Sequence, residues 1–111
     1  MLVKLRILVV IAFAMLVGCV NIPTPPSEIK GIYISSLKYE SVDCPRLSVE
    51  LDSLVARESR LVLTQQQRIE ESGTQEFWFG VGKGDGIEAN ELAIVRGEKE
   101  AVRTAMQTKK C

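Results

Sequence analysis

The chain has 111 residues, enough for one small domain, and its 14 basic and 14 acidic residues give a formal net charge of zero. Since these charges form no basic stripe, the composition argues against a nucleic-acid-binding protein. The sequence contains no histidine, the commonest general base and a common metal ligand, so we expect neither an enzyme nor a cofactor or metal site.

The N-terminus has the three parts of a signal peptide. Lys4 and Arg6 form a basic start, residues 7–17 are an apolar run, and the small Gly18 precedes Cys19. A membrane-spanning helix needs roughly 20 apolar residues, whereas this run has about eleven, so we expect a segment that is removed after export. An uncleaved N-terminal anchor, lengthened by the preceding apolar residues, is the alternative.

Four residues at the end of this segment resemble the lipobox of bacterial lipoproteins: Leu16, Val17, Gly18 and Cys19. In that family the cysteine is lipidated and becomes the first residue of the mature chain. The resemblance implies that residues 1–18 are cleaved off and that Cys19 carries acyl chains in membrane lipid. Several such chains hold a small protein on a bilayer almost permanently, because each buried methylene contributes about 0.8 kcal/mol.

The residue after the lipidated cysteine affects the expected location. In this family an Asp there favours retention in the inner membrane, and this chain has Val20 instead. We therefore expect a lipid-anchored protein on the periplasmic face of the outer membrane, with the inner membrane as the alternative. Removal of residues 1–18 takes away two basic residues and no acidic ones, so the mature chain has a net charge of about −2.

Three cysteines occur in the sequence, and lipidation would use Cys19. Cys44 and Cys111 then form an even pair in an oxidising compartment, where a disulfide between them is the expected arrangement. Such a bond would stabilise the fold by roughly 4 kcal/mol, because it closes a long loop in the unfolded chain. Two reactive thiols, or bridges between molecules, are the alternatives.

Residues 19–42 are expected to form an acylated start and an extended tether. Three prolines between Val20 and Ser27 disfavour helix and favour polyproline geometry, which would lift the domain off the membrane. Residues 31–39 are prone to β-structure but have no partner strand. We therefore expect them to lie extended along the helices or to stay mobile.

A first helix is expected to begin near Asp43, a good N-cap residue, with Pro45 tolerated in the first turn. Positions spaced alternately by four and three form a heptad seam, leucine-rich at first and polar later: Leu47, Leu51, Leu54, Glu58, Leu61, Gln65 and Arg68. Three more residues widen its apolar face: Val55, Val62 and Ile69. Ser72 and Gly73 offer a stop, because glycine suits the left-handed position after a helix end.

A second helix is indicated by Asp85 and Glu88, whose spacing resembles a capping box with Asp as the N-cap. Its seam follows the same alternation: Leu92, Val95, Lys99, Val102 and Met106. Beside the seam every fourth residue is small, which forms a ridge that another helix can approach closely: Ala89, Ala93, Gly97, Ala101 and Ala105. The alternative explanation is that alanine is simply a good helix former.

The cysteine positions agree with two antiparallel helices. The midpoint between Cys44 and Cys111 falls between Phe77 and Trp78, inside the expected break, so two arms of similar length would bring the cysteines together. We therefore predict an all-α fold, a coiled-coil-like helical hairpin over residues 43–111 that is closed by the disulfide. Two helices bury little surface, so a protein partner or self-association would be needed to cover the remaining faces.

Phe77, Trp78 and Phe79 stand beside a glycine-rich break between the two helices. Three adjacent aromatic residues would suit contact with a partner protein, since Trp is a favoured hot-spot residue. They would equally suit a bilayer interface, where Trp is enriched. The third alternative is that they fold back and cover the end of the hairpin.

The mature region is similar to a group of small, uncharacterised bacterial lipoproteins. The matching stretches are residues 44–50, 76–86 and 92–111, the last of which ends in Lys-Lys-Cys. The resemblance implies the hairpin and its disulfide but no activity. We hypothesise a structural or protein-binding accessory module of the cell envelope. The alternative is a membrane-active factor, of phage or mobile-element origin, that inserts its aromatic tip into lipid.

Overall fold

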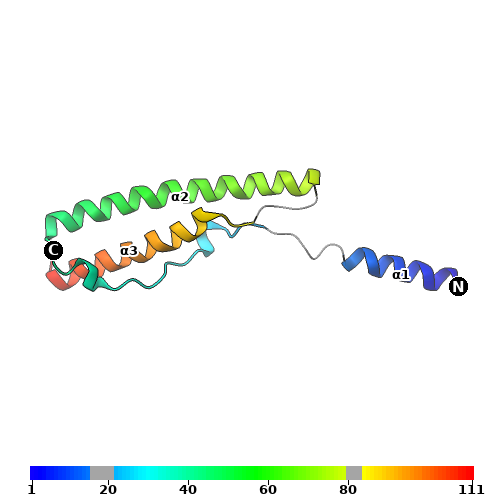
Figure 1. The fold of residues 1–111 in the computed structure, drawn as a ribbon, viewed down its shortest axis with the longest axis horizontal. Coiled ribbons are helices and arrows are strands. Elements are labelled where there is room, and N and C mark those ends of the chain that lie inside the picture. Colours follow the sequence, from blue (N-terminus) through cyan, green and yellow to red (C-terminus); the bar gives the residue numbers. More distant parts are fainter. Residues whose placement is uncertain (16–21, 80–83) are drawn as a thin grey trace.

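The computed structural model describes residues 1–15, 22–79 and 84–111, and these parts contain helices and no strand (Figure 1). The elements in chain order are α1 (Leu2–Met15), η2 (Pro26–Glu28), η3 (Ser36–Tyr39), α2 (Cys44–Phe79) and α3 (Ile87–Lys109), where η marks a short 3₁₀ helix. Helices α2 and α3 lie side by side and run in opposite directions. The prediction of an all-α antiparallel hairpin is confirmed.

Helix α1 covers most of the expected signal peptide. It has 14 residues and is strongly apolar, and Figure 1 draws it apart from the other helices. Across residues 1–15, 22–79 and 84–111, no helix is both long and apolar enough to cross a membrane. The lipobox, residues 16–19, lies outside the described residues, so its cleavage and lipidation stay predictions.

Helix α2 begins where the sequence predicts but ends later. The Asp43 carboxylate accepts a hydrogen bond from the N–H of Arg46 at 3.0 Å, as an N-cap residue does. The predicted stop at Ser72 and Gly73 is wrong, because the helix continues to Phe79. One glycine costs a helix about 1 kcal/mol, and the glutamate and glutamine residues on both sides of it favour helix strongly enough to offset that cost.

Helix α3 starts without the predicted capping box. Its N-cap is Gly86, which makes no side-chain capping bond, whereas the carboxylate of Asp85 is bound by other parts of the chain. The capping prediction is wrong because these tertiary partners compete with the local pattern. At the other end Lys110 has a left-handed backbone with φ of 57°, and its N–H donates to the carbonyl of Gln107. This conformation ends the helix.

The predicted disulfide joins the start of α2 to the end of α3. The sulfur atoms of Cys44 and Cys111 are 2.04 Å apart, and the two Cα atoms are 5.6 Å apart. Helix α2 has 36 residues and α3 has 23, so at 1.5 Å per residue α2 is about 20 Å longer. The hairpin therefore has a closed end at the disulfide and an open end where α2 extends past α3 (Figure 1).

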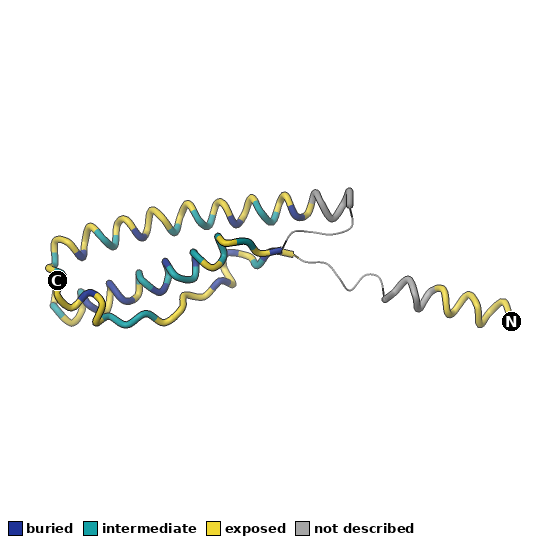
Figure 2. Tube along the Cα trace, in the orientation of Figure 1, coloured by how far each residue is buried: buried dark blue, intermediate teal, exposed yellow. Residues whose placement is uncertain are grey.

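The core follows the predicted seam. Leu47 and Leu54 of α2 share one apolar cluster with Val95 and Val102 of α3, and all four side chains are at most 2% exposed. Tyr39 of η3 joins this cluster with 6% exposure. Figure 2 shows buried positions recurring along both long helices. Because the leucines are concentrated in the first half of α2, the apolar core lies toward the closed end.

Residues 22–43, the N-terminal segment, run along α3 as a third layer (Figures 1 and 2). Pro26 and Ile29 are buried, and the N–H of Ile32 donates to the carbonyl of Ala93 at 3.1 Å. From residue 22 onward the predicted tether is therefore packed on the hairpin rather than clear of it. The reason is that Pro23, Pro26 and Ile29 cover apolar surface that two helices alone leave bare.

Candidate functional site

Five polar side chains at the open end, which we name the polar latch, tie the N-terminal segment to both long helices. Thr24 donates from its N–H and its hydroxyl to the two carboxylate oxygens of Asp85, at 2.6 Å each. Gln65 of α2 is fully buried, and its Nε2 donates to the Thr24 carbonyl at 2.9 Å and to Asp85 at 2.8 Å. Arg68 of α2 pairs with Glu88 of α3 at 2.8 Å.

The latch favours the ionised form of its two carboxylates. Burial opposes the charge on Asp85, but hydrogen bonds from Thr24 and Gln65 and the charge of Arg68 outweigh it, so the pKa of Asp85 is lowered. The pKa of Glu88 is lowered by a hydrogen bond from its own backbone N–H and by Arg68, which together outweigh its partial burial. Both carboxylates are therefore charged at neutral pH, and acid weakens the latch.

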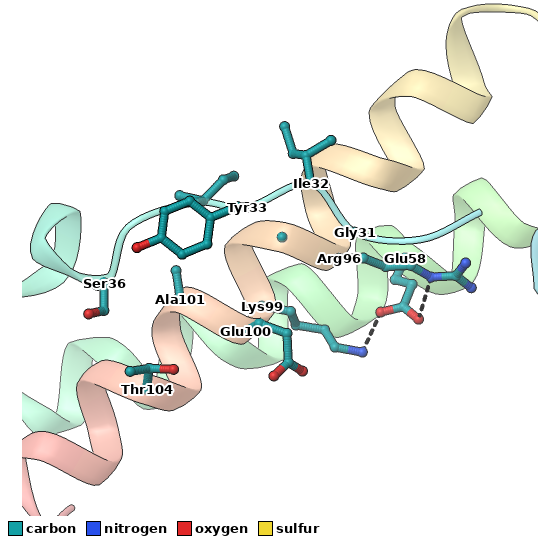
Figure 3. A pocket seen from close by; sticks show the side chains of 12 residues that line it. Gly31, Ile32, Tyr33, Ser36, Glu58, Arg96, Lys99, Glu100, Ala101 and Thr104 are labelled. Carbon is teal, nitrogen blue, oxygen red and sulfur yellow. Dashed lines mark hydrogen bonds and ion pairs between the residues drawn. The ribbon is translucent and has the colours of Figure 1, made fainter. Parts of the chain in front are cut away.

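A second ionic cluster links α2, α3 and the N-terminal segment near the middle of the hairpin. Glu58 of α2 pairs with Lys99 and with Arg96 of α3, and its distance to the Arg96 Nε is 3.4 Å (Figure 3). Arg96 also donates to the backbone carbonyls of Pro26 and Ile29. Burial opposes ionisation of Glu58, but the two cations outweigh it and lower its pKa. Arg96 thus joins all three layers.

Two glycines let the N-terminal segment approach α3 closely. A Cβ atom added to Gly97 would lie 2.1 Å from the carbonyl oxygen of Ile32, and one added to Gly31 would lie 2.8 Å from the backbone nitrogen of Gly97. The small-residue ridge therefore has a packing partner, but at Ala93 and Gly97 this partner is an extended segment and not the expected helix. The other ridge residues are partly or fully buried: Ala89, Ala101 and Ala105.

A groove of about 650 Å³ opens beside this contact, between the N-terminal segment and α3 (Figure 3). Tyr33 lines the groove and is 91% exposed. Two other apolar residues of the same stretch, Ile32 and Leu37, are 48% and 71% exposed. We name these three residues the segment patch. Large apolar side chains exposed within one short stretch suit contact with another molecule.

Apart from the small-residue ridge, the predicted site residues fall into three groups. Cys44 and Cys111 meet in the predicted disulfide. The lipobox, residues 16–19, is outside the described residues. Residues 77–79 form the last turn of α2, but their side chains are outside the described structure, so the predicted contact role of Phe77, Trp78 and Phe79 stays a prediction.

Sequence reasoning missed the roles of Thr24 and Arg96. Both bind partners more than 50 residues away along the chain, and no periodicity marks such contacts. One available signal was Gln65, a polar residue in an apolar seam. A buried amide needs hydrogen-bond partners, and donors and acceptors from outside the helices would supply them.

Within residues 1–15, 22–79 and 84–111, no three His, Cys, Asp or Glu side chains form a group that would hold a metal ion. In comparisons with known proteins, no protein-family model, curated protein or solved structure matches the chain. The function therefore has to be inferred from the residues and their geometry.

Proposed function

We propose that the protein is a lipid-anchored, periplasm-facing lipoprotein that acts as a structural or protein-binding accessory module of the cell envelope. The observation that carries this proposal is how the three cysteines are used. Cys44 and Cys111 are joined, which leaves Cys19 for lipidation at the position where the sequence resembles a lipobox. A disulfide also suits the oxidising side of a bacterial membrane.

The shape of the hairpin supports a structural or binding role. Helix α2 is about 54 Å long, and the folded chain consists of this helix, the shorter α3 and one extended segment. A rod of this kind presents a long surface for its mass. The segment patch gives that surface an apolar contact point, and Tyr33 is of a residue type that is enriched at the centres of protein interfaces. The expected partner is another envelope protein or a second copy of the chain.

Metabolic labelling tests the lipid anchor. In a Gram-negative host grown with an alkyne-bearing fatty acid, we expect the wild-type chain to take up the label and to sediment with membranes. Cys19→Ser should lose the label and accumulate at the length of the precursor. Cys111→Ser, the matched control, should keep the label although it lacks the disulfide. A wild-type chain without label would contradict the proposal.

Site-specific photo-crosslinking tests the binding role. A photoreactive residue at Tyr33 should give a discrete protein adduct in cells, whereas the same residue at the exposed Gln66 of α2 should not. Mass spectrometry of the adduct would then identify the partner. The binding role would be rejected if position 33 gave no protein adduct, or if both positions gave the same adducts.

A further inference from the structure

A second groove, which we name the closed-end groove, lies where the N-terminal segment meets the start of α2. Its volume is about 470 Å³. Two charged residues of α2 line it, Arg46 and Glu50, together with apolar residues from both elements: Tyr39, Val42, Pro45 and Val49. It shares no lining residue with the groove beside the segment patch, so the two surfaces are distinct.

The apolar part of the closed-end groove is open to solvent. Val49 is 70% exposed, Pro45 is exposed and Val42 is half-buried, while the buried Tyr39 forms the wall behind them. Removal of such side chains from water is favourable. Their grouping at one end of the hairpin therefore suits contact with another molecule.

Arg46 and Glu50 stand beside this apolar part, one helical turn apart, which is about 6 Å along α2. Neither side chain forms an ion pair with any residue in the ranges 1–15, 22–79 and 84–111. Arg46 lies in the first turn of α2, where the helix dipole disfavours a cation. A basic residue four positions before an acidic one is also the less favourable order for pairing within one helix. Partners from outside the chain would suit both charges better.

Two antiparallel copies of α2 would supply those partners. If a two-fold axis passes near residue 48, Arg46 of each copy lies at the level of Glu50 of the other copy. A two-fold contact uses the same surface twice, so these two residues would give two ion pairs. Val49 of both copies would lie close to the axis, where the exposed apolar side chains cover one another.

We propose that the closed-end groove is a dimer contact, in which a second copy of the chain packs antiparallel against α2 and Arg46 pairs with Glu50 of the other copy. Charge complementarity favours this occupant, because the groove carries one charge of each sign in the order that its own two-fold copy matches. The proposal assigns the second copy to a surface other than the segment patch, and it does not depend on the lipidation of Cys19.

Photo-crosslinking of the full chain in a Gram-negative host tests for the dimer. A photoreactive residue at Val49 should give an adduct of twice the chain mass, in which mass spectrometry finds this protein alone. Leu63 is the matched control, because it is an exposed apolar residue of α2 about 21 Å from Val49 and beyond the reach of the second copy. The control should give no such adduct.

An adduct of position 49 with a different protein, or no adduct there, would overturn the proposal. The fatty-acid label described above is read in the same cells. A failed anchor and a failed dimer are therefore separate results.

Charge reversal tests the pairing. Arg46→Glu alone and Glu50→Arg alone each place like charges opposite one another in both contacts of the dimer. Each should lower the yield of the adduct from position 49 by about tenfold or more, because like charges in contact oppose association. When the two variants are expressed together with different tags, the adduct between them should return, because each contact then joins opposite charges.

Circular dichroism establishes that both variants keep their helices. An adduct yield that neither variant changes would mean that these charges do not join the two copies. Loss in both variants without recovery in the mixture would mean that the charges act within one chain. Either result overturns the antiparallel contact.

Discussion

The two ends of the hairpin are held by different chemistry. At the closed end a covalent bond between Cys44 and Cys111 adjoins an apolar cluster that includes Leu47. At the open end the chain is held by the polar latch, whose central carboxylate is Asp85 and whose buried donor is Gln65. Apolar burial and a disulfide do not depend on the ionisation of carboxylates, whereas the latch does. The closed end is therefore insensitive to pH, whereas the contacts of the open end persist only where the carboxylates of the latch are charged.

The largest effect is expected from opening the closed end. Cys44→Ser combined with Cys111→Ser removes a bond that spans a sequence separation of 67 residues. We expect the free energy of unfolding of the full chain in detergent to fall by about 4 kcal/mol, because the unfolded chain gains the freedom of that loop. Chemical denaturation followed by circular dichroism measures the change. Reductant should shift the wild type to the same midpoint and leave the double variant unaffected; unchanged stability of the variant would contradict the comparison.

A smaller loss is expected from the apolar cluster. Leu54 is 2% exposed, so Leu54→Ala should lower the free energy of unfolding by about 3 kcal/mol through lost burial and the cavity that remains. Leu63 lies on the same helix and is 64% exposed, which makes Leu63→Ala the matched control. The control should change the free energy of unfolding by less than about 0.5 kcal/mol. Similar losses at the two positions would argue against a core concentrated at the closed end.

The contact between the layers is tested by two glycine substitutions that should change the free energy of unfolding in opposite directions. Gly97→Ala places a methyl group against the backbone of Ile32, so we expect a loss of about 1–3 kcal/mol and faster proteolysis within the N-terminal segment. Gly73→Ala has no atom within 4 Å of the added methyl group. It should stabilise the helix by about 0.5–1 kcal/mol, because alanine is the better helix former. A stabilising Gly97→Ala would mean that the segment is not held against α3.

The smallest effect is expected from acid, and it should separate the two ends. The pKa values of Asp85 and Glu88 are lowered in the folded chain, so the unfolded chain binds more protons in acid. The stability that these groups contribute is present above their unfolded pKa values and is lost as pH falls through the folded ones. The loss is modest because both side chains are partly exposed.

Hydrogen exchange across a pH series measures this difference within one molecule. Amide protection near Leu92, beside the open end, should fall with acidification before protection near Val102 does. Asp85→Asn should reduce the pH dependence near Leu92, since the residue no longer titrates. Parallel loss of protection at both positions would mean that the hairpin responds to pH as one unit.

The parts of the fold that the sequence predicts well are those set by spacing along one chain element. The leucines of the seam, such as Leu47 and Leu54, follow from helical periodicity. The cap at Asp43 was predictable for the same reason, because its partner is three residues away. The pairing of Cys44 with Cys111 follows from the even pair of cysteines that remains when Cys19 is set aside.

The parts that the sequence does not predict depend on competition between local and distant partners. Asp85 has the spacing of a capping residue, yet Thr24 and Gln65 bind its carboxylate from other elements. Gly73 resembles a helix stop, but the glutamate-rich sequence around it carries α2 onward. The ridge at Gly97 was recognised as a packing surface, while its partner was not, because an extended segment has no periodicity to match.

The disulfide ring begins at Cys44, so the whole N-terminal segment lies outside it. If Cys19 is lipidated as proposed, a pulling force between the N-terminus and anything bound to the helices would be carried by non-covalent contacts alone. The contacts of Thr24 would be loaded first, then the bonds from Arg96 to the segment, and then the bond of Ile32. Such contacts, loaded one after another, give way at low force. Once released, residues 22–43 could span up to roughly 70 Å at about 3.3 Å per residue while the ring keeps the hairpin folded. The segment is thus a reserve of chain length that tension can draw out.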